Sequence, residues 1–371
     1  MKSKKVDTML LSITILLVST GLFVFTSASF GLFARKGFSL YSLLFDQVVL
    51  GLLIGGIALV VALKVPLSVW RKYSLHLFIG ASILTLFVFV PYIGFSHGGA
   101  SRWISIGSLS LQPSEFLKLG VVVYCAALLP LLKERMRTFS RVFPLILGVM
   151  VVPTVILIAE PDTGTLAVTF SAVIAMFLAA GMKFRHLLVM IAVAMLALGT
   201  LAMFQPYVKE RVLTFFDPSR DPQGSGYQIQ KSFLAVGSGG IMGRGFGQSI
   251  QKYGSLPEPT GDSIFAVVGE EFGFVGGTLI IILFLLFGIR GIQIARLAPD
   301  AFSGLLAVGI VILIISQSFA NIASTLGVVP FTGVPLVFVS HGGTALIAAL
   351  LEIGILLNIS KFTRSTFSKQ K

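Results

Sequence analysis

Charged residues are scarce in this chain. Only 12% of its 371 residues are Asp, Glu, Lys or Arg, whereas 55% are hydrophobic and the mean hydropathy is +0.95. Soluble globular domains carry about twice that share of charged residues. The composition therefore excludes a soluble protein and indicates an integral membrane protein.

Cysteine is almost absent as well. The single Cys125 lies inside an apolar run, so it can form no disulfide within the chain. No CxxC or HExxH pattern occurs, and we assign no metal to dedicated protein ligands. The net charge of +13 is not gathered in a soluble basic domain, which excludes nucleic acid as a partner.

Internal repeats and low-complexity tracts are also missing, which favours a single domain over residues 1–371. Since one membrane span needs about 20 apolar residues, the apolar runs predict an all-α protein with about ten transmembrane helices. The first run is too long for a signal peptide and lacks a cleavage site, so we read it as a retained helix. The expected spans are 7–29, 43–63, 74–94, 113–132, 142–159, 164–182, 187–204, 268–289, 303–325 and 344–360. Gly51 and Gly55 form a GxxxG pattern that predicts close helix packing in the second span.

The positive charges predict the orientation in the membrane. Short cytoplasmic loops are enriched in Lys and Arg, and most of the 28 such residues fall on one side if the N-terminus is inside. Both termini are then cytoplasmic. Most of the acids lie on the opposite, outer side.

One connection, from about Gln205 to Gly261, is far longer than usual and is predicted to be a functional outer loop over 205–262. Its glycines from Gly237 to Gly247 lack the spacing of a nucleotide-binding P-loop. Two readings stay open for them. They form a re-entrant or surface segment, or they let the backbone approach the diphosphate of an outer-leaflet lipid.

The segment LPEPTGDSIFAVVGEE, residues 256–271, brings four carboxylates to the start of an apolar helix. Acids are costly near a bilayer and usually have a function there. Asp262 is either the N-cap of that helix or a catalytic base. Glu270 and Glu271 cannot both face lipid, and one of them is expected to be a supporting acid or a partner of Lys118.

Two further segments interrupt the apolar sequence. In residues 99–120, Trp103 suits the membrane interface, Arg102 is either an anchor or a cation for a lipid phosphate, and Glu115 and Lys118 have the spacing of an ion pair on one helix. Residues 321–354 contain several prolines and glycines, a pattern tolerated where backbone lines a cavity. Ser340 and His341 lie there without a G-x-S-x-G elbow, so a hydrolase triad is not expected. Glu352 is expected to be paired within the bundle.

These segments together resemble the SEDS family (shape, elongation, division and sporulation) of polytopic peptidoglycan polymerases. The resemblance extends over essentially the whole chain. It rests on motifs in the family's order: GASRW (99–103), QPSEFLKL (112–119), PDTGT (161–165), FFDPSRDPQGSGYQ, GRGFGQSIQK, LPEPTGD, GEEFG and PFTGVPLVFVSHGG. The stretch GFGQSIQKYGSLPE is closer to the cell-division member than to the elongation member. PTG at 259–261, His341 and Thr344 depart from the usual pattern.

The resemblance implies that the chain polymerises lipid II on the outer face of the cytoplasmic membrane, at the division septum. Asp262 is then the base, and the cations that hold the departing diphosphate come from Arg102, Arg211, Arg244 and Lys252. Supporting roles fall to Trp103, Glu115, Lys118, Glu270, Glu271, Ser340 and His341. A Mg or Mn ion at the diphosphate stays open, as no ligand motif is needed for it.

The implied partners are a class B penicillin-binding protein, other division proteins and membrane lipids. Three alternatives remain. A polymerase of cell elongation would share these motifs. A lipid II transporter would place its acids at the midplane and show an inverted repeat, and neither feature is seen. A pure scaffold would leave the Asp262 segment without a purpose.

Overall fold

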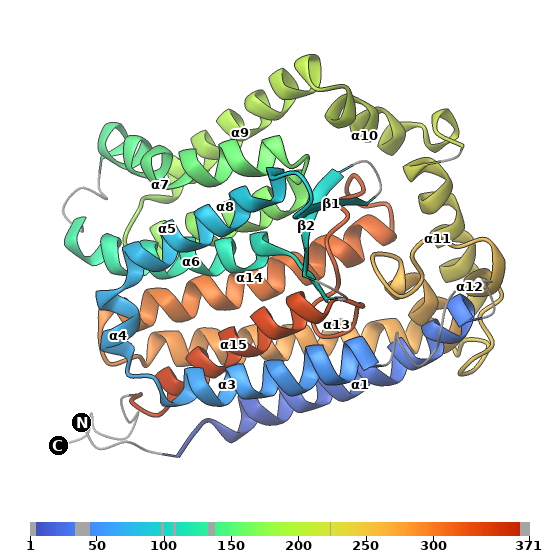
Figure 1. The fold of residues 1–371 in the computed structure, drawn as a ribbon, viewed down its shortest axis with the longest axis horizontal. Coiled ribbons are helices and arrows are strands. Elements are labelled where there is room, and N and C mark those ends of the chain that lie inside the picture. The colour runs from blue at the N-terminus through green and yellow to red at the C-terminus, as the bar shows by residue number, and fades with distance from the viewer. Residues whose placement is uncertain are drawn as a thin grey trace.

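A computed structural model describes residues 5–33, 45–97, 100–106, 109–132, 138–222 and 224–363. Long helices run roughly side by side, and the strands and the helices α10, α11 and α12 lie toward one end of the bundle (Figure 1). The long helices are α1 (Thr8–Phe33), α6 (Pro113–Leu128), α7 (Phe139–Ala159), α8 (Thr163–Ala179), α9 (Phe184–Phe204), α13 (Ile264–Arg296), α14 (Ala301–Thr325) and α15 (Gly343–Ser360). The shorter helices are η1 (Asp46–Ile54), α3 (Gly55–Lys64), α4 (Leu67–Lys72), α5 (Ser74–Leu86), η2 (Phe87–Phe89), α10 (Pro206–Phe216), η4 (Pro218–Arg220), α11 (Ser225–Gly239) and α12 (Gln251–Gly254).

The apolar helices confirm the predicted spans. Among the described residues, eight helices are long and apolar enough to cross a membrane, and two shorter apolar helices cover Ser74–Phe89 and Thr163–Ala179. Each lies at one of the predicted places. The chain is therefore an all-α, multi-pass membrane protein. Whether it works as one domain stays a prediction.

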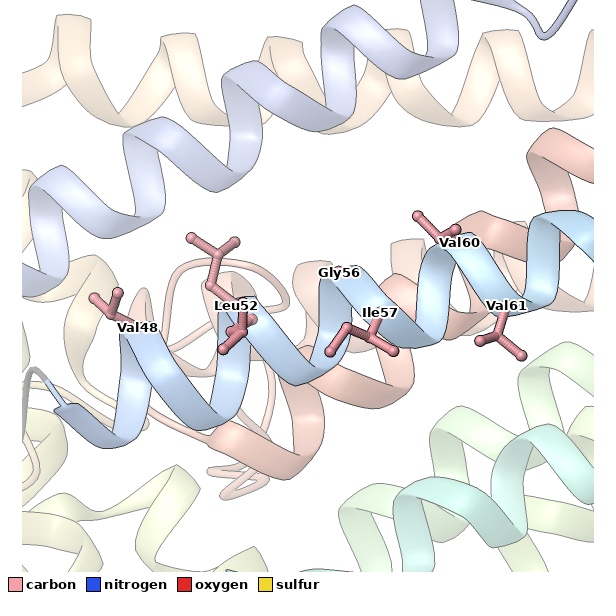
Figure 2. A pocket seen from close by; sticks show the side chains of 7 residues that line it. Val48, Leu52, Gly56, Ile57, Val60 and Val61 are labelled. Carbon is pink, nitrogen blue, oxygen red and sulfur yellow. The ribbon is translucent and has the colours of Figure 1, made fainter.

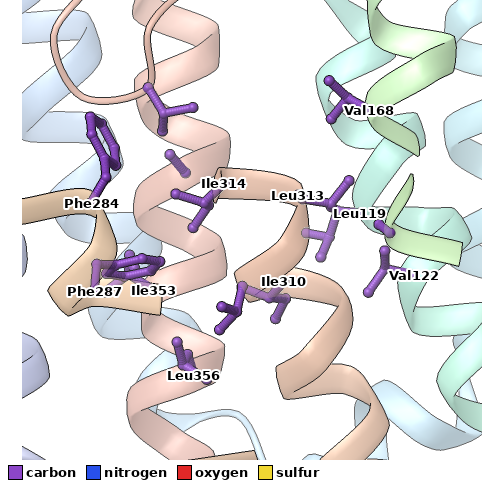
Figure 3. Close-up of a cluster of buried hydrophobic side chains, with 14 of the residues drawn as sticks. Leu119, Val122, Val168, Phe284, Phe287, Ile310, Leu313, Ile314, Ile353 and Leu356 are labelled. Atoms are coloured by element: carbon purple, nitrogen blue, oxygen red, sulfur yellow. The ribbon is translucent and has the colours of Figure 1, made fainter. Parts of the chain in front are cut away.

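Helix α14 lies at the centre of the packing. Its Ile310, Leu313 and Ile314 lie between side chains of α6 and α8 on one side and of α13 and α15 on the other (Figure 3). Because lipid is as apolar as these side chains, close van der Waals packing stabilises such an interface. This packing holds α14 together with α6, α8, α13 and α15, and the loops that carry the charged residues begin at the ends of these helices.

The second span packs on α15 as its glycines predict. A Cβ on Gly51 would lie 3.0 Å from a methyl of Leu346, and one on Gly55 would lie 2.7 Å from a methyl of Leu350. The opposite face carries an apolar groove of about 520 Å³ (Figure 2). It is lined by Val48, Leu52, Leu53, Gly56, Ile57, Val60 and Val61. This face is suited to lipid.

Two regions differ from the prediction. The third span ends at Phe89, and a small antiparallel sheet follows, formed by β1 (Gly94–His97), β2 (Ala100–Ile106) and β3 (Leu109–Leu111) in the order β1-β2-β3. In addition, the connection over 205–262 is built largely of α10, α11 and α12. The sheet and these helices are stabilised by contacts with the end of the bundle, and hydropathy alone does not predict such contacts.

Some of the charges used to predict orientation lie outside the described residues. These are Lys2, Lys4, Arg35, Lys36, Lys133, Glu134, Arg135, Arg137, Arg364, Lys369 and Lys371, together with Gly99 of the GASRW motif. The ends of α1 and α15 nevertheless meet, because the backbone N–H of Asp7 donates to Ser360 Oγ at 3.0 Å. Asp7 also forms an ion pair with Arg290 at 2.6 Å. This end of the bundle is opposite the sheet (Figure 1).

Candidate active site

Asp262 lies in a tight turn just before α13. The backbone N–H groups of Gly261 and Ser263 donate to the carbonyl of Glu258 at 3.1 and 3.2 Å, and Glu258 has a φ of 44°. Helix α13 begins at Ile264 with Ser263 as its N-cap residue. Asp262 is therefore not the N-cap, and its half-buried carboxylate is free for another role.

The Asp262 carboxylate converges with two guanidinium groups over the backbone of Gly333. A Cβ added to Gly333 would lie 3.5 Å from Asp262 Oδ2, 3.4 Å from Arg211 Nη2 and 3.9 Å from Arg102 Nη1. Gly333 has a φ of 65°, which side chains other than glycine rarely adopt. The glycine is thus the floor of a site whose walls carry one acid and two cations.

Separate elements hold the two arginines. Arg102, on β2, donates from Nε to the carbonyl of Glu160 at 3.3 Å and from Nη2 to the carbonyl of Pro161. Arg211, on α10, donates to the carbonyl of Thr332 at 3.1 Å. Tyr207 lies between them, since its hydroxyl is 3.1 Å from Arg102 Nη2 and its ring centroid 4.4 Å from Arg211 Cζ. Each guanidinium keeps further donors for an anionic ligand.

Burial and neighbouring charges bring the pKa of Asp262 close to neutral pH. Burial raises its pKa from 3.8 to about 6, and the Glu258 carboxylate adds to the rise, whereas Arg102 and Arg211 oppose it. A carboxylate with such a pKa is largely ionised at pH 7 and can still accept a proton readily. The arrangement therefore suits a general base beside an anion-binding pair.

A second acid pair flanks Arg102 on the turn between α7 and α8. Asp162 is buried and caps α8, because its carboxylate accepts from the N–H of Thr165 at 3.1 Å and from its hydroxyl at 2.8 Å. Neither carboxyl oxygen of Glu160 has a hydrogen-bond partner in the described part of the chain. Burial raises the pKa of Glu160 to about 8, with Asp162 adding to the rise and Arg102 opposing it.

Ser340 and His341 brace the Asp262 turn and form no nucleophilic pair. The Ser340 hydroxyl donates to the carbonyl of Gly261 at 2.8 Å and accepts from the N–H of Leu336 at 2.8 Å. The His341 N–H donates to the carbonyl of Thr260 at 2.6 Å. Both residues therefore contact the turn that carries Asp262, and their supporting role stays a prediction.

The predicted second pair of cations lies elsewhere. Lys252 is fully buried, and its ammonium group lies 2.5 Å from Glu271 Oε1 and 2.9 Å from Ser27 Oγ of α1. Arg244 lies 3.6 Å from Glu270 Oε1. Glu270 lies on α13 six residues beyond its first residue, Ile264, which is roughly 9 Å along the helix axis. The structure therefore does not bring Arg244 and Lys252 together with Asp262.

Glu270 and Glu271 fasten the glycine-rich segment to α13. Glu270 accepts from Ser249 Oγ at 2.5 Å and from the N–H of Ile250 at 2.9 Å, and Glu271 accepts from Ser27 Oγ at 2.5 Å. In the described part of the chain neither acid pairs with Lys118, so of the two alternatives the Lys118 pair was wrong. The reason is that the chain over 237–254 folds back over α13 and places Lys252 of α12 beside Glu271.

Lys118 and Glu115 form the predicted ion pair at 2.9 Å inside the bundle. Lys118 also donates to Gln317 Oε1. Glu115, Lys118 and Glu352 line a cavity of about 10 Å³, which has room for about one water molecule. Trp103 is half-buried on β2, next to Arg102.

Four residues of the site were not predicted from the sequence: Tyr207, Asp162, Glu160 and Gly333. Asp162 lies in the PDTGT motif, and Tyr207 precedes Arg211 by one helical turn, so both have a local signal in the sequence. Glu160 and Gly333 had no local signal. Only the fold places Glu160 beside Arg102 and Gly333 beside Asp262.

The comparisons with known proteins identify the family of the chain. The family model FTSW_RODA_SPOVE, described as cell cycle protein, matches residues 7–365. The chain belongs to the FtsW/RodA/SpoVE family. This is the family predicted from the motifs.

Members of the FtsW/RodA/SpoVE family resemble the chain along nearly its whole length. Stage V sporulation protein E of Bacillus subtilis is 37% identical, with 98% of this chain and 99% of that protein covered. The "Probable peptidoglycan glycosyltransferase FtsW" of a Geobacter species is 39% identical, with 95% and 96% covered.

Two solved structures have a similar fold along nearly the whole chain. A chain from a peptidoglycan synthase complex, studied for its coordination of polymerization and crosslinking, has a TM-score of 0.80 at 27% identity, with 96% of this chain and 97% of that chain covered. The rod shape determining protein RodA of Thermus thermophilus has a TM-score of 0.69 at 25% identity, with 97% and 98% covered.

Proposed function

We propose that this chain is a peptidoglycan glycosyltransferase that polymerises lipid II for the septal wall in cell division. The convergence of Asp262, Arg102 and Arg211 over Gly333 carries the proposal. This site lies where the bundle helices end, at a depth that the headgroup of a lipid-linked sugar can reach. The named activity of the FtsW relatives supports the same reaction.

Asp262 acts as the base in this reaction. The 4-hydroxyl of the acceptor sugar gives its proton to Asp262 while its oxygen bonds to the anomeric carbon of the donor. The bond from that carbon to the diphosphate oxygen breaks, and the lipid diphosphate departs with both electrons. Arg102 and Arg211 stabilise the negative charge that develops on the diphosphate, because one guanidinium group can donate two hydrogen bonds to phosphate oxygens.

A divalent cation at the diphosphate stays a prediction. Within the part of the chain that the structure describes, no group of three or more His, Cys, Asp or Glu side chains could hold a metal ion. A Mg or Mn ion would therefore take ligands from the diphosphate itself. No step above depends on it.

The proposal extends to place and partner. The site end of the bundle faces outward, both termini are cytoplasmic, and the protein works at the division septum. A class B penicillin-binding protein crosslinks the strands, in line with the similar chain from a synthase complex of polymerization and crosslinking. Other division proteins recruit the pair.

Polymerisation of labelled lipid II by the purified chain with its partner tests the function. We expect glycan strands on a gel. Transport of lipid II across vesicle membranes without any strand would instead establish the transporter. Depletion in cells separates the subtypes, because filaments indicate division and rounded cells indicate elongation.

A further inference from the structure

Asn321 on α14 holds the main chain of Asp262 itself. Its side-chain amide Nδ2 donates to the Asp262 carbonyl at 2.9 Å and to the Val334 carbonyl at 2.8 Å. The side chain is 1% exposed. Val334 follows Gly333, so one amide group joins the base-bearing turn to the floor of the site.

We propose that Asn321 is a positioning residue that fixes Asp262 over Gly333, an inference that rests on the proposed function. The chemistry requires an amide. Two carbonyl oxygens that face one side chain need two donors, and an NH2 group supplies one hydrogen to each. An aspartate of the same shape places an oxygen against both carbonyls and repels them.

The neighbouring contacts do not replace this one. Ser340 and His341 tie the carbonyls of Gly261 and Thr260 to the segment after Leu336. Asn321 alone of these three contacts the Asp262 carbonyl and reaches the residue next to Gly333. Helix α14, which carries Asn321, is packed at the centre of the bundle (Figure 3). The amide therefore fixes the site to a rigid part of the molecule.

Loss of the amide lets Asp262 and Gly333 move independently. Misplacement by about 1 Å costs on the order of 10²-fold in rate. The loss falls on kcat, because the base is misplaced while the arginines that bind the diphosphate keep their own anchors on Glu160, Pro161 and Thr332.

Asn358 provides a matched control. It is also a buried asparagine, 3% exposed, and its amide donates to the carbonyls of Ala62 at 3.1 Å and Val65 at 2.6 Å. These bonds lie at the other end of the bundle. Asn358→Ala therefore removes the same kind of interaction without touching the site.

The test measures kcat and KM for lipid II with the full chain in complex with its partner. We expect Asn321→Ala and Asn321→Asp each to lower kcat per folded molecule at least tenfold with KM within about twofold, and Asn358→Ala to keep wild-type kcat. A kcat for both Asn321 variants equal to that of Asn358→Ala would overturn the proposal, as would a loss confined to KM. If Asn321→Ala does not fold, Asn321→Asp and Asn321→Ser are judged by the same criterion. Failure of the proposed function is separate, because wild type and Asn358→Ala would then make no polymer.

Discussion

At the scale of the residue, the site depends on a balance around one carboxylate. Asp262 is partly withdrawn from water and faces the negative charge of Glu258, and both effects raise its pKa. Arg102 and Arg211 limit the rise. With fewer cations the carboxylate would stay protonated at neutral pH, and with more exposure it would be a weak base.

The pH dependence of kcat/KM follows from this balance. Asp262 must be ionised to accept a proton, so kcat/KM is expected to fall as the pH decreases through about 6. Glu258→Gln removes a neighbouring negative charge, which lowers the pKa of Asp262 and moves the acid limb to lower pH. Asp217→Asn, in the exposed part of the long connection, is the control and leaves the limb in place. An acid limb that is unmoved in Glu258→Gln, or shifted to higher pH, contradicts this account.

At the scale of the element, α12 and the glycine-rich segment before it are bonded to α13 and α1. Lys252 and Glu271 are both buried, and Ser27 of α1 lies within hydrogen-bond distance of each. A buried ion pair contributes little net stability, yet removal of one partner leaves an uncompensated charge. The pair thus fixes the fold of the segment and makes it sensitive to single changes.

Lys252→Met is expected to destabilise the protein by about 3–5 kcal/mol, because Glu271 remains as a buried charge without its partner. The double variant Lys252→Met with Glu271→Leu is expected to recover a large part of that loss. Thermal unfolding in detergent measures both, with exposed Lys209→Met as the control. Equal midpoints for Lys252→Met and Lys209→Met would refute the claim.

Prediction from the sequence succeeds where a property is local. Hydropathy locates the membrane helices because each apolar run carries its own signal, and the three-residue spacing of Glu115 and Lys118 is enough to predict their ion pair. It fails where partners are distant in sequence. Nothing near Lys252 indicates that Glu271 and Ser27 will enclose it, and Lys118 was an equally reasonable partner for Glu271. The strands over 94–111 stayed hidden because they are short and flank a span.

At the scale of the whole molecule, the candidate active site and the Asp7–Arg290 ion pair lie at opposite ends of the bundle. The Asp262 site, the sheet and the helices of the long connection lie at one end, and the Asp7–Arg290 pair and the contact of α1 with α15 lie at the other (Figure 1). An enzyme that uses a lipid-linked sugar outside the cell needs this polarity. The orientation in the membrane is therefore part of the functional proposal.

Cysteine labelling tests that orientation directly. Cys125 is the only cysteine and is buried, so the background is low. A membrane-impermeant maleimide added to intact spheroplasts is expected to label Tyr92→Cys, beside β1 at the site end, and not Arg71→Cys on α4. Both should react after permeabilisation. Labelling of Arg71→Cys alone in intact cells would mean that the site faces the cytoplasm.

The role of Asp262 as the base is best tested by polymerisation of labelled lipid II with purified Asp262→Asn in complex with its partner. The substitution keeps the size of the side chain and removes its ability to accept the hydroxyl proton. We predict a loss of about 10²-fold or more in strand formation, with unfolding temperature and partner binding as in wild type. Strand formation by Asp262→Asn at the wild-type rate would contradict the assignment of Asp262 as the base.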